Sequence, residues 1–198
     1  ASRSNALLAW AMNDAPLPML NGFPLRLVVP GWYSTYWVKA LSSIEVLDAP
    51  FEGFWMKKAY RIPADDARES PEALSKDTVP IGRMNVRSLF VPPRADATLR
   101  RGALVELQGV AWDGGSGIGR VEVSFDGGGA WHDARLEGDL GPYAWRRWRA
   151  VWMPDVSGPA TVLARATSVA GERQEPTPRW NRSGYMRNEP ERLEVVVA

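Results

Sequence analysis

The chain contains no cysteine and only one histidine, His132. Without cysteine, these 198 residues can form no disulfide, no thiolate metal site and no thiol nucleophile. One histidine cannot build a zinc site, and no Gly-x-Ser-x-Gly sequence supports a serine–histidine pair. His132 follows a turn signal and is predicted to be exposed. The sequence therefore offers no metal site of its own.

An excess of charge of either sign is also missing. The chain has 24 basic and 23 acidic residues, which gives a formal net charge of +1. This balance does not indicate a nucleic-acid or membrane surface, so any anion site must be local. No apolar run reaches the ~18 residues needed to span a bilayer, and no signal peptide opens the chain. The sequence alone is compatible with a cytosolic protein, a mature protein or a fragment.

Arginine 26 is the most informative charge in the first half. It lies in the apolar run 25–29, which is predicted to be a strand between a Pro/Gly-rich turn cluster and the stop signal Pro30-Gly31. An arginine there needs an anion or a carboxylate partner. Its planar fork suits bidentate recognition of phosphate. The sequence leaves both open: a bound anion, or a structural ion pair.

The rest of the first half is less regular. Residues 37–41 are predicted to be a short helix or turn, and 43–47 and 84–90 to be strands. Residues 51–62 interleave four aromatic side chains with three cations, a pattern typical of anion or nucleic-acid binding, although the near-zero net charge argues against nucleic acid. Residues 63–81 are predicted to be a polar excursion with one helical turn.

A change of character follows the segment Val91-Pro92-Pro93-Arg94, which is the predicted domain boundary between residues 1–90 and 91–198. Beyond it, strand-length segments recur between turn signals. They are residues 103–110, 119–125, 130–136, 145–152, 160–168 and 192–197. The Asp126-Gly127-Gly128 sequence predicts a hairpin, because both glycines accept positive φ. This pattern predicts an all-β sandwich, immunoglobulin-like without the disulfide.

Residues 12–39, MNDAPLPMLNGFPLRLVVPGWYSTYWVK, resemble the second half of the molybdopterin-binding domain of the sulfite oxidase family. Within that family they are most similar to the bacterial sulfite dehydrogenases (sulfite:cytochrome c oxidoreductases). The second half also resembles the family, in the sequences GVAWDGG (109–115), RVEVS (120–124) and WNRSGY (180–185). The order of these sequence motifs along the chain implies an α+β half of the molybdopterin domain followed by an immunoglobulin-like domain.

The resemblance implies cofactor-binding roles for five residues. Arg26 corresponds to an arginine that contacts the phosphate of the pterin cofactor. Trp37, Val38 and Lys39 match a segment that touches the pterin through backbone and lysine, although an exposed lysine is an equally good interpretation of Lys39. Asn21 stands where many relatives have a histidine. Asparagine can still donate a hydrogen bond there but cannot carry a charge.

Two further residues are implied to lie at the substrate. Tyr60 corresponds to an active-site tyrosine and is the expected catalytic residue, although a tyrosine among cations is also typical of an interface or a half-buried core. Arg182 lies about one position from a substrate-facing arginine of the second domain. The remaining tryptophans are expected in the core, because aromatic side chains dominate sandwich packing.

The resemblance implies a periplasmic enzyme that oxidises sulfite to sulfate at a molybdenum–molybdopterin centre and passes electrons to a c-type cytochrome, with haem c on a partner subunit. A dimer through the second domain is also implied, with no nucleic-acid or membrane partner. The family binds molybdenum through a cysteine that this chain lacks, so we expect the 198 residues to be the C-terminal part of a longer polypeptide.

Two alternatives remain at this stage. One is a related molybdopterin oxidoreductase that acts on nitrate or a sulfoxide. The other is a non-catalytic immunoglobulin-like interaction module.

Overall fold

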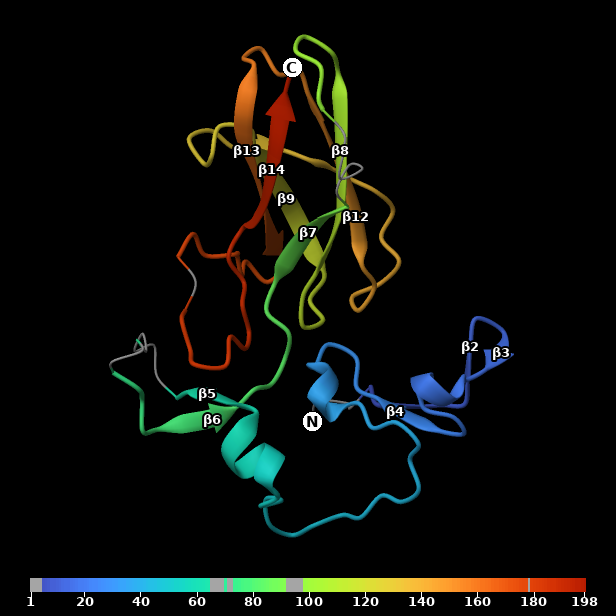
Figure 1. The fold of residues 1–198 in the computed structure, drawn as a ribbon. Coiled ribbons are helices and arrows are strands. Elements are labelled where there is room, and N and C mark those ends of the chain that lie inside the picture. Colours follow the sequence, from blue (N-terminus) through green and yellow to red (C-terminus); the bar gives the residue numbers. More distant parts are fainter. Residues whose placement is uncertain (1–4, 65–69, 71–72, 92–97, 178) are drawn as a thin grey trace. The chain divides into compact units, whose positions relative to one another are not determined.

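The computed structural model describes residues 5–64, 70, 73–91, 98–177 and 179–198 (Figure 1). These residues form two compact units, the first from residues 1–84 with 179–186 and the second from 85–178 with 187–198. The predicted division at residues 90 and 91 therefore falls inside strand β7, which belongs to the second unit. Of the predicted boundary segment, residues 92–94 lie outside the described residues, as do residues 65–69 and 71–72 of the 63–81 excursion.

Short strands and single helical turns make up the first unit. Its elements are β1 (Leu7–Ala9), β2 (Ala11–Met12), β3 (Ala15–Pro16), η1 (Met19–Asn21), β4 (Arg26–Val28), η2 (Ser34–Tyr36), η3 (Trp55–Ala59), β5 (Arg61–Pro63) and β6 (Thr78–Pro80). β1 pairs with β4, β2 with β3 and β5 with β6, all antiparallel. η1 and η2 are 3-10 helices and η3 is a π-helical turn.

The α+β expectation for this half is not met. The helical elements among its described residues are the 3-10 helices η1 and η2 and the π-helical turn η3, and none of them is an α-helix. The strand predicted at 43–47 is also wrong. Ile44 and Val46 alternate with polar residues but are 64% and 93% exposed, and no described strand pairs with them. An alternating segment forms a strand only where a neighbour completes its hydrogen bonds.

Little of the first unit is buried. Leu17 and Ile81 are its only large apolar side chains in the buried class among the described residues. Many others are exposed: Leu7, Leu8, Trp10, Met12, Met19, Leu20, Phe23, Val38, Ile44, Val46, Leu47, Phe51, Phe54 and Trp55. Such an extensive apolar surface is unusual for a self-contained domain.

The second unit is a two-layer β-sandwich. Its strands are β7 (Arg87–Val91), β8 (Val105–Trp112), β9 (Ile118–Ser124), β10 (His132–Asp133), β11 (Arg135–Leu136), β12 (Arg146–Trp152), β13 (Gly158–Ser168) and β14 (Glu191–Val197). One antiparallel sheet has the order β10-β9-β13-β14 and the other β11-β12-β8-β7. The unit is all-β, as its sequence predicts.

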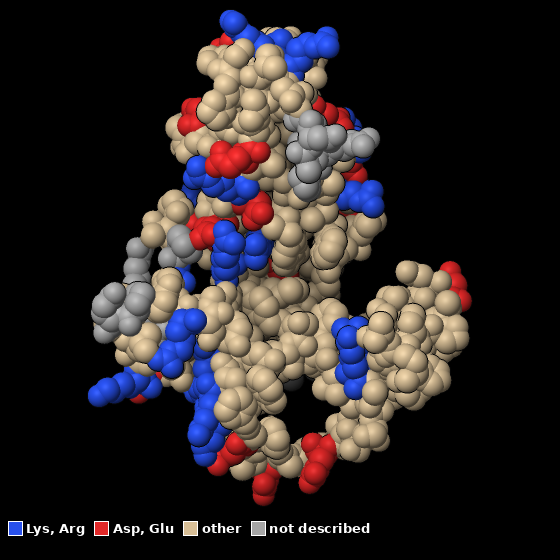
Figure 2. All heavy atoms as spheres, in the orientation of Figure 1, with Lys and Arg blue, Asp and Glu red and all other residues tan. Residues whose placement is uncertain are grey.

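The sandwich core follows directly from the alternation along the strands. Val121 and Val123 of β9, like Val162 and Ala164 of β13, are completely buried. Trp148 of β12 lies among them, with its ring edge-on to Phe90 at 5.3 Å between ring centroids. Side chains two positions apart face the same side of a strand, so the apolar residues at alternate positions of these strands meet in the core between the sheets. Acidic and basic side chains are interspersed over the visible surface (Figure 2).

Residues 130–136 do not form the single strand that the sequence predicts. β10 belongs to the β9 sheet and β11 to the β12 sheet. The chain crosses between the sheets at Ala134, whose amide donates to the Val121 carbonyl at 2.8 Å. The hairpin at Asp126-Gly127-Gly128 is confirmed, because β9 and β10 are antiparallel and Gly127 and Gly128 have φ of 71° and 110°. His132 is exposed, as predicted.

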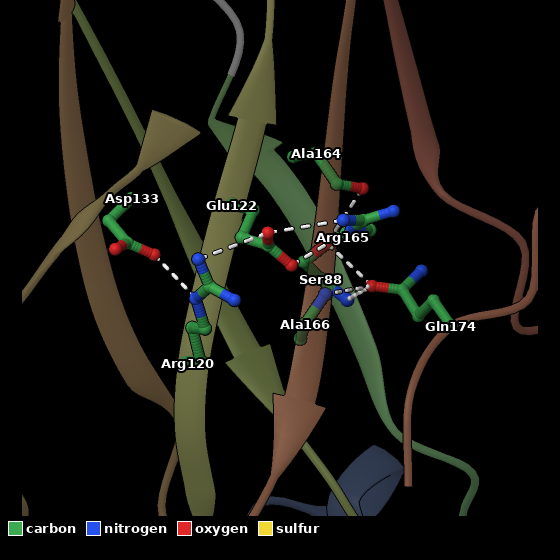
Figure 3. A network of polar contacts seen from close by, with 8 residues as sticks. All are labelled: Ser88, Arg120, Glu122, Asp133, Ala164, Arg165, Ala166 and Gln174. Carbon is green, nitrogen blue, oxygen red and sulfur yellow. Dashed lines mark hydrogen bonds and ion pairs between the residues drawn. The ribbon is translucent and has the colours of Figure 1, made fainter. Parts of the chain in front are cut away.

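Two buried polar side chains stabilise the sandwich, Gln174 between the two sheets and Glu122 within one of them (Figure 3). The buried Gln174 Oε1 accepts hydrogen bonds from Ser88 N of β7 at 2.8 Å and Ala166 N of β13 at 2.9 Å, so it joins the two sheets. On β9, the nearly buried Glu122 carboxylate receives Arg165 Nε at 2.9 Å and Nη2 at 3.1 Å. Burial of a carboxylate is tolerated because this guanidinium compensates it.

Replacing Gln174 with leucine is expected to lower the free energy of unfolding of the sandwich by about 2–4 kcal/mol, since it leaves two buried amides without an acceptor. Chemical denaturation measures the effect. Glu175→Leu, at the exposed neighbouring position, is the control and should change the free energy by less than about 0.5 kcal/mol. Equal stability of the two variants would show that Gln174 does not hold the sheets together.

No helix in the described part of the chain has the length and apolar content that crossing a membrane requires.

Candidate functional site

Two clusters of side chains in the first unit contain all the candidate site residues except Arg182. The first is built on the turn at η1, strand β4 and the segment after η2. We call it the basic cradle, and it consists of Asn21, Gly22, Arg26, Trp37, Val38 and Lys39. The second lies at η3 and the loop of residues 179–186. We call it the aromatic cluster, and it consists of Trp55, Tyr60 and Tyr185.

The backbone of the cradle is held by hydrogen bonds between its segments. The Leu27 amide donates to the Val38 carbonyl at 2.9 Å, and the Ala40 amide donates to the Gly22 carbonyl at 3.2 Å. Trp37 Nε1 donates to the Val29 carbonyl at 2.9 Å. Residues 37–41 thus run beside β4 as an irregular segment, which places Arg26 and Lys39 in one cluster.

Glycine is required at position 22. Its φ is +107°, in the left-handed region that side chains disfavour. A Cβ there would lie 3.1 Å from both Cα and Cβ of Lys39. The turn after η1 can therefore approach the Lys39 stem closely, and Lys39 Nζ donates to the Leu20 carbonyl at 2.7 Å.

Arg26 has no carboxylate partner among the described residues. Its Nη1 donates to the Asn21 carbonyl at 3.2 Å, and its guanidinium lies over the Trp37 ring at 5.5 Å from the centroid. Its Nε is buried and makes no hydrogen bond with any described residue. An unpaired buried donor on a cation is costly unless an anion satisfies it. The cradle therefore contains a cationic donor that no described residue satisfies.

The five residues predicted to bind a cofactor thus lie together, but not in equal roles. Arg26 and Lys39 retain donors that a ligand could use. Trp37 and the Val38 carbonyl are already engaged in holding the cradle. The Asn21 carbonyl accepts from Arg26. Sequence reasoning missed Gly22, which the Asn21-Gly22 turn signal could have revealed.

In the aromatic cluster, rings fix Tyr60 from two directions. Tyr60 stacks on Trp55, with 5.3 Å between ring centroids and 24° between planes, and Tyr185 lies at 5.8 Å and 48°. Its amide donates to the Trp55 carbonyl at 2.8 Å and its carbonyl accepts from Ile81 N at 2.9 Å. Among the described residues, nothing forms a hydrogen bond with the Tyr60 hydroxyl. The hydroxyl is thus available to a ligand.

Two of the three cations near Tyr60, Arg61 and Lys57, have structural partners. Arg61 Nε donates to Thr78 Oγ1 at 2.8 Å and its Nη1 to the Met56 carbonyl at 3.0 Å. Lys57 pairs with Glu52 at 2.8 Å. The interleaved aromatics and cations of residues 51–62 therefore serve mainly to shape this segment. Nearby, burial raises the pKa of Tyr36, whose hydroxyl donates to the Ile81 carbonyl, so it acts as a neutral donor.

Arg182 is exposed and lies in the loop that also carries Tyr185. Residues 179–186 belong to the first unit although their neighbours in sequence belong to the sandwich. The structure thus places Arg182 and Tyr60 in the same unit. Within the described residues, no cluster of three or more His, Asp or Glu side chains could hold a metal ion.

Comparison with known proteins matches both halves of the chain. The family model described as oxidoreductase molybdopterin binding domain matches residues 1–55, and that described as Mo-co oxidoreductase dimerisation domain matches residues 78–197. The chain is 31% identical to mitochondrial sulfite oxidase of Rattus norvegicus and 32% identical to that of Homo sapiens. Each comparison covers 98% of this chain and 37% of the relative.

Two further relatives bear on the chemistry. The chain is 29% identical to nitrate reductase [NAD(P)H] of Hordeum vulgare, over 93% of this chain and 23% of that protein. Among solved structures, the sulfane dehydrogenase SoxCD from Paracoccus pantotrophus is similar with a TM-score of 0.82 and 27% identity. That comparison covers 97% of this chain and 49% of the SoxCD chain. The chain thus spans little more than a third of the curated sulfite oxidases and about half of the SoxCD chain.

Proposed function

Because the chain belongs to the sulfite oxidase family of molybdopterin oxidoreductases, we propose that it is part of an enzyme that oxidises sulfite to sulfate and passes the electrons to a c-type cytochrome. The observation that carries the proposal is the basic cradle, where Arg26 keeps a buried donor for which the described residues supply no acceptor. A pterin phosphate supplies the missing acceptor. Arg26 and Lys39 bind it, while Gly22 and Trp37 hold these cations in place.

The chemistry that the molybdenum–molybdopterin cofactor supplies when bound is two-electron oxygen transfer. This chain supplies charge and position. Tyr60 offers its hydroxyl to an oxygen of the substrate anion, and Arg182 adds positive charge for a dianion. The chain contains no cysteine, so the thiolate ligand of molybdenum comes from elsewhere.

The exposed apolar side chains of the first unit support a further part of the proposal. In the active enzyme they pack against a polypeptide segment that completes the molybdopterin domain and carries that thiolate. The second unit is the immunoglobulin-like dimerisation domain, and its family match supports a dimer through it. The enzyme is proposed to be periplasmic, with haem c on a partner subunit.

Replacing Tyr60 with phenylalanine tests the site. The variant keeps the ring contacts and loses one hydrogen bond to an anion, so kcat/KM for sulfite should fall about 10–100-fold. Steady-state assays of the complete enzyme with sulfite and ferricytochrome c measure this. Tyr143→Phe, a hydroxyl deletion on the sandwich, is the control. If both kcat and KM for sulfite are unchanged in Tyr60→Phe, the catalytic assignment is wrong.

The match to barley nitrate reductase supports a second candidate, reduction of nitrate at the same cradle. Parallel assays with nitrate and sulfite separate the two, and a sulfoxide substrate is distinguished in the same way. A non-catalytic interaction module would contain no stoichiometric molybdenum, so elemental analysis of the complete protein decides that alternative.

A further inference from the structure

Tyr185 connects the loop of residues 179–186 to the proposed catalytic tyrosine. About 125 positions separate Tyr185 from Tyr60 in sequence, yet their rings lie 5.8 Å apart. Trp55 stacks on Tyr60 as a second neighbour at 5.3 Å. With its backbone amide and carbonyl both bonded, Tyr60 has only its side-chain torsions free, and these two rings restrict them.

Asn181 holds Tyr185 in this position. Asn181 is 8% exposed, and its Nδ2 donates to the Tyr185 carbonyl at 2.8 Å. Its Oδ1 accepts from the Tyr185 amide at 3.0 Å. The turn between them is closed by the Gly184 amide, which donates to the Asn181 carbonyl at 3.0 Å, and Gly184 has a φ of +65°. A single buried amide thus fixes both backbone groups of Tyr185.

We propose that Tyr185 is a positioning residue for the reaction: its ring sets the direction of the Tyr60 hydroxyl toward the substrate anion. This inference rests on the proposed function, since it acts through Tyr60. A hydroxyl without a partner among the described residues has no hydrogen bond of its own to orient it, so the neighbouring rings must do so. A small error in its direction would cost much of its benefit to the transition state.

A double-mutant cycle in the complete holoenzyme tests the inference. Tyr185→Leu removes the ring and should lower kcat/KM for sulfite about 10-fold and weaken binding of sulfate, measured by calorimetry. Tyr185→Phe keeps the ring and should stay within about 2-fold of wild type. In the Tyr60→Phe background, Tyr185→Leu should add less than about 2-fold in both measurements, because residues that act through one another are non-additive.

The outcomes separate this inference from the proposed function. If Tyr60→Phe alone is silent, the role proposed for Tyr60 and this inference both fail. If Tyr60→Phe is damaging but Tyr185→Leu is silent, or is equally damaging in both backgrounds, only this inference fails. Tyr185→Met, whose unbranched side chain is longer and adapts to an irregular space, replaces Tyr185→Leu in the cycle if thermal unfolding shows that the leucine variant does not fold.

Discussion

Replacing Gly109 with alanine is expected to destabilise the sandwich by about 3 kcal/mol or more, the effect of overpacking a rigid core. A Cβ on Gly109 of β8 would lie 2.1 Å from the Leu89 carbonyl oxygen and 2.3 Å from Cζ2 of Trp148. Leu89 belongs to β7, which pairs with β8, and Trp148 is completely buried. Neither neighbour can move without breaking the sheet or the core.

Chemical denaturation measures this change, followed by tryptophan fluorescence, to which the buried Trp148 contributes together with the other nine tryptophans. Gly138→Ala is the matched control, since no atom lies within 4 Å of its added Cβ and its φ is not in the left-handed region. A Gly109→Ala variant within about 1 kcal/mol of wild type would mean that β7, β8 and Trp148 do not pack as described.

Replacing Arg26 with glutamine in the complete protein is expected to lower its molybdenum and pterin content at least about 10-fold. The variant loses the positive charge and the two parallel N–H donors with which a guanidinium binds a phosphate. A hydrogen bond to a charged group contributes about 1.5–3 kcal/mol. Arg26→Lys keeps the charge without the fork and should retain an intermediate amount. Elemental analysis and pterin fluorescence of the purified variants give the result.

Lys76→Gln is the control for Arg26→Gln, because it makes the same change of charge at an exposed position of the first unit. Full cofactor content in Arg26→Gln would contradict the role of the cradle. Equal loss in both variants would point instead to a general effect of net charge.

Most of the sandwich could be predicted from its sequence, because β13 and β14 bury alternate side chains and β9 alternates apolar and polar residues, although Glu122 and Ser124 of β9 are buried as well. The crossing within residues 130–136 could not be predicted, because it depends on the tertiary structure. The residues before Ala134 pair with β9 of one sheet, and those after it pair with β12 of the other. The expectation that the remaining tryptophans are core residues was wrong for Trp10, Trp55, Trp145 and Trp180, which are 69%, 60%, 63% and 41% exposed. Aromatic character alone does not determine burial.

The candidate site was predictable where its residues are close in sequence. Asn21, Arg26 and Lys39 lie within one short segment, and the structure brings them together. Their contacts with a cofactor stay a prediction. Tyr185 could not be found in this way, since only the fold brings it to Tyr60. The family resemblance, by contrast, is confirmed by the comparisons with sulfite oxidases.

The central claim is that Arg26 binds the phosphate of the pterin cofactor. A crystal structure of the complete holoenzyme tests it through one distance, between the Arg26 guanidinium and the nearest phosphate oxygen. We predict that a guanidinium nitrogen lies within about 3.2 Å of that oxygen, the range of a hydrogen bond. A guanidinium paired with a carboxylate, with the phosphate bound elsewhere, would contradict the account.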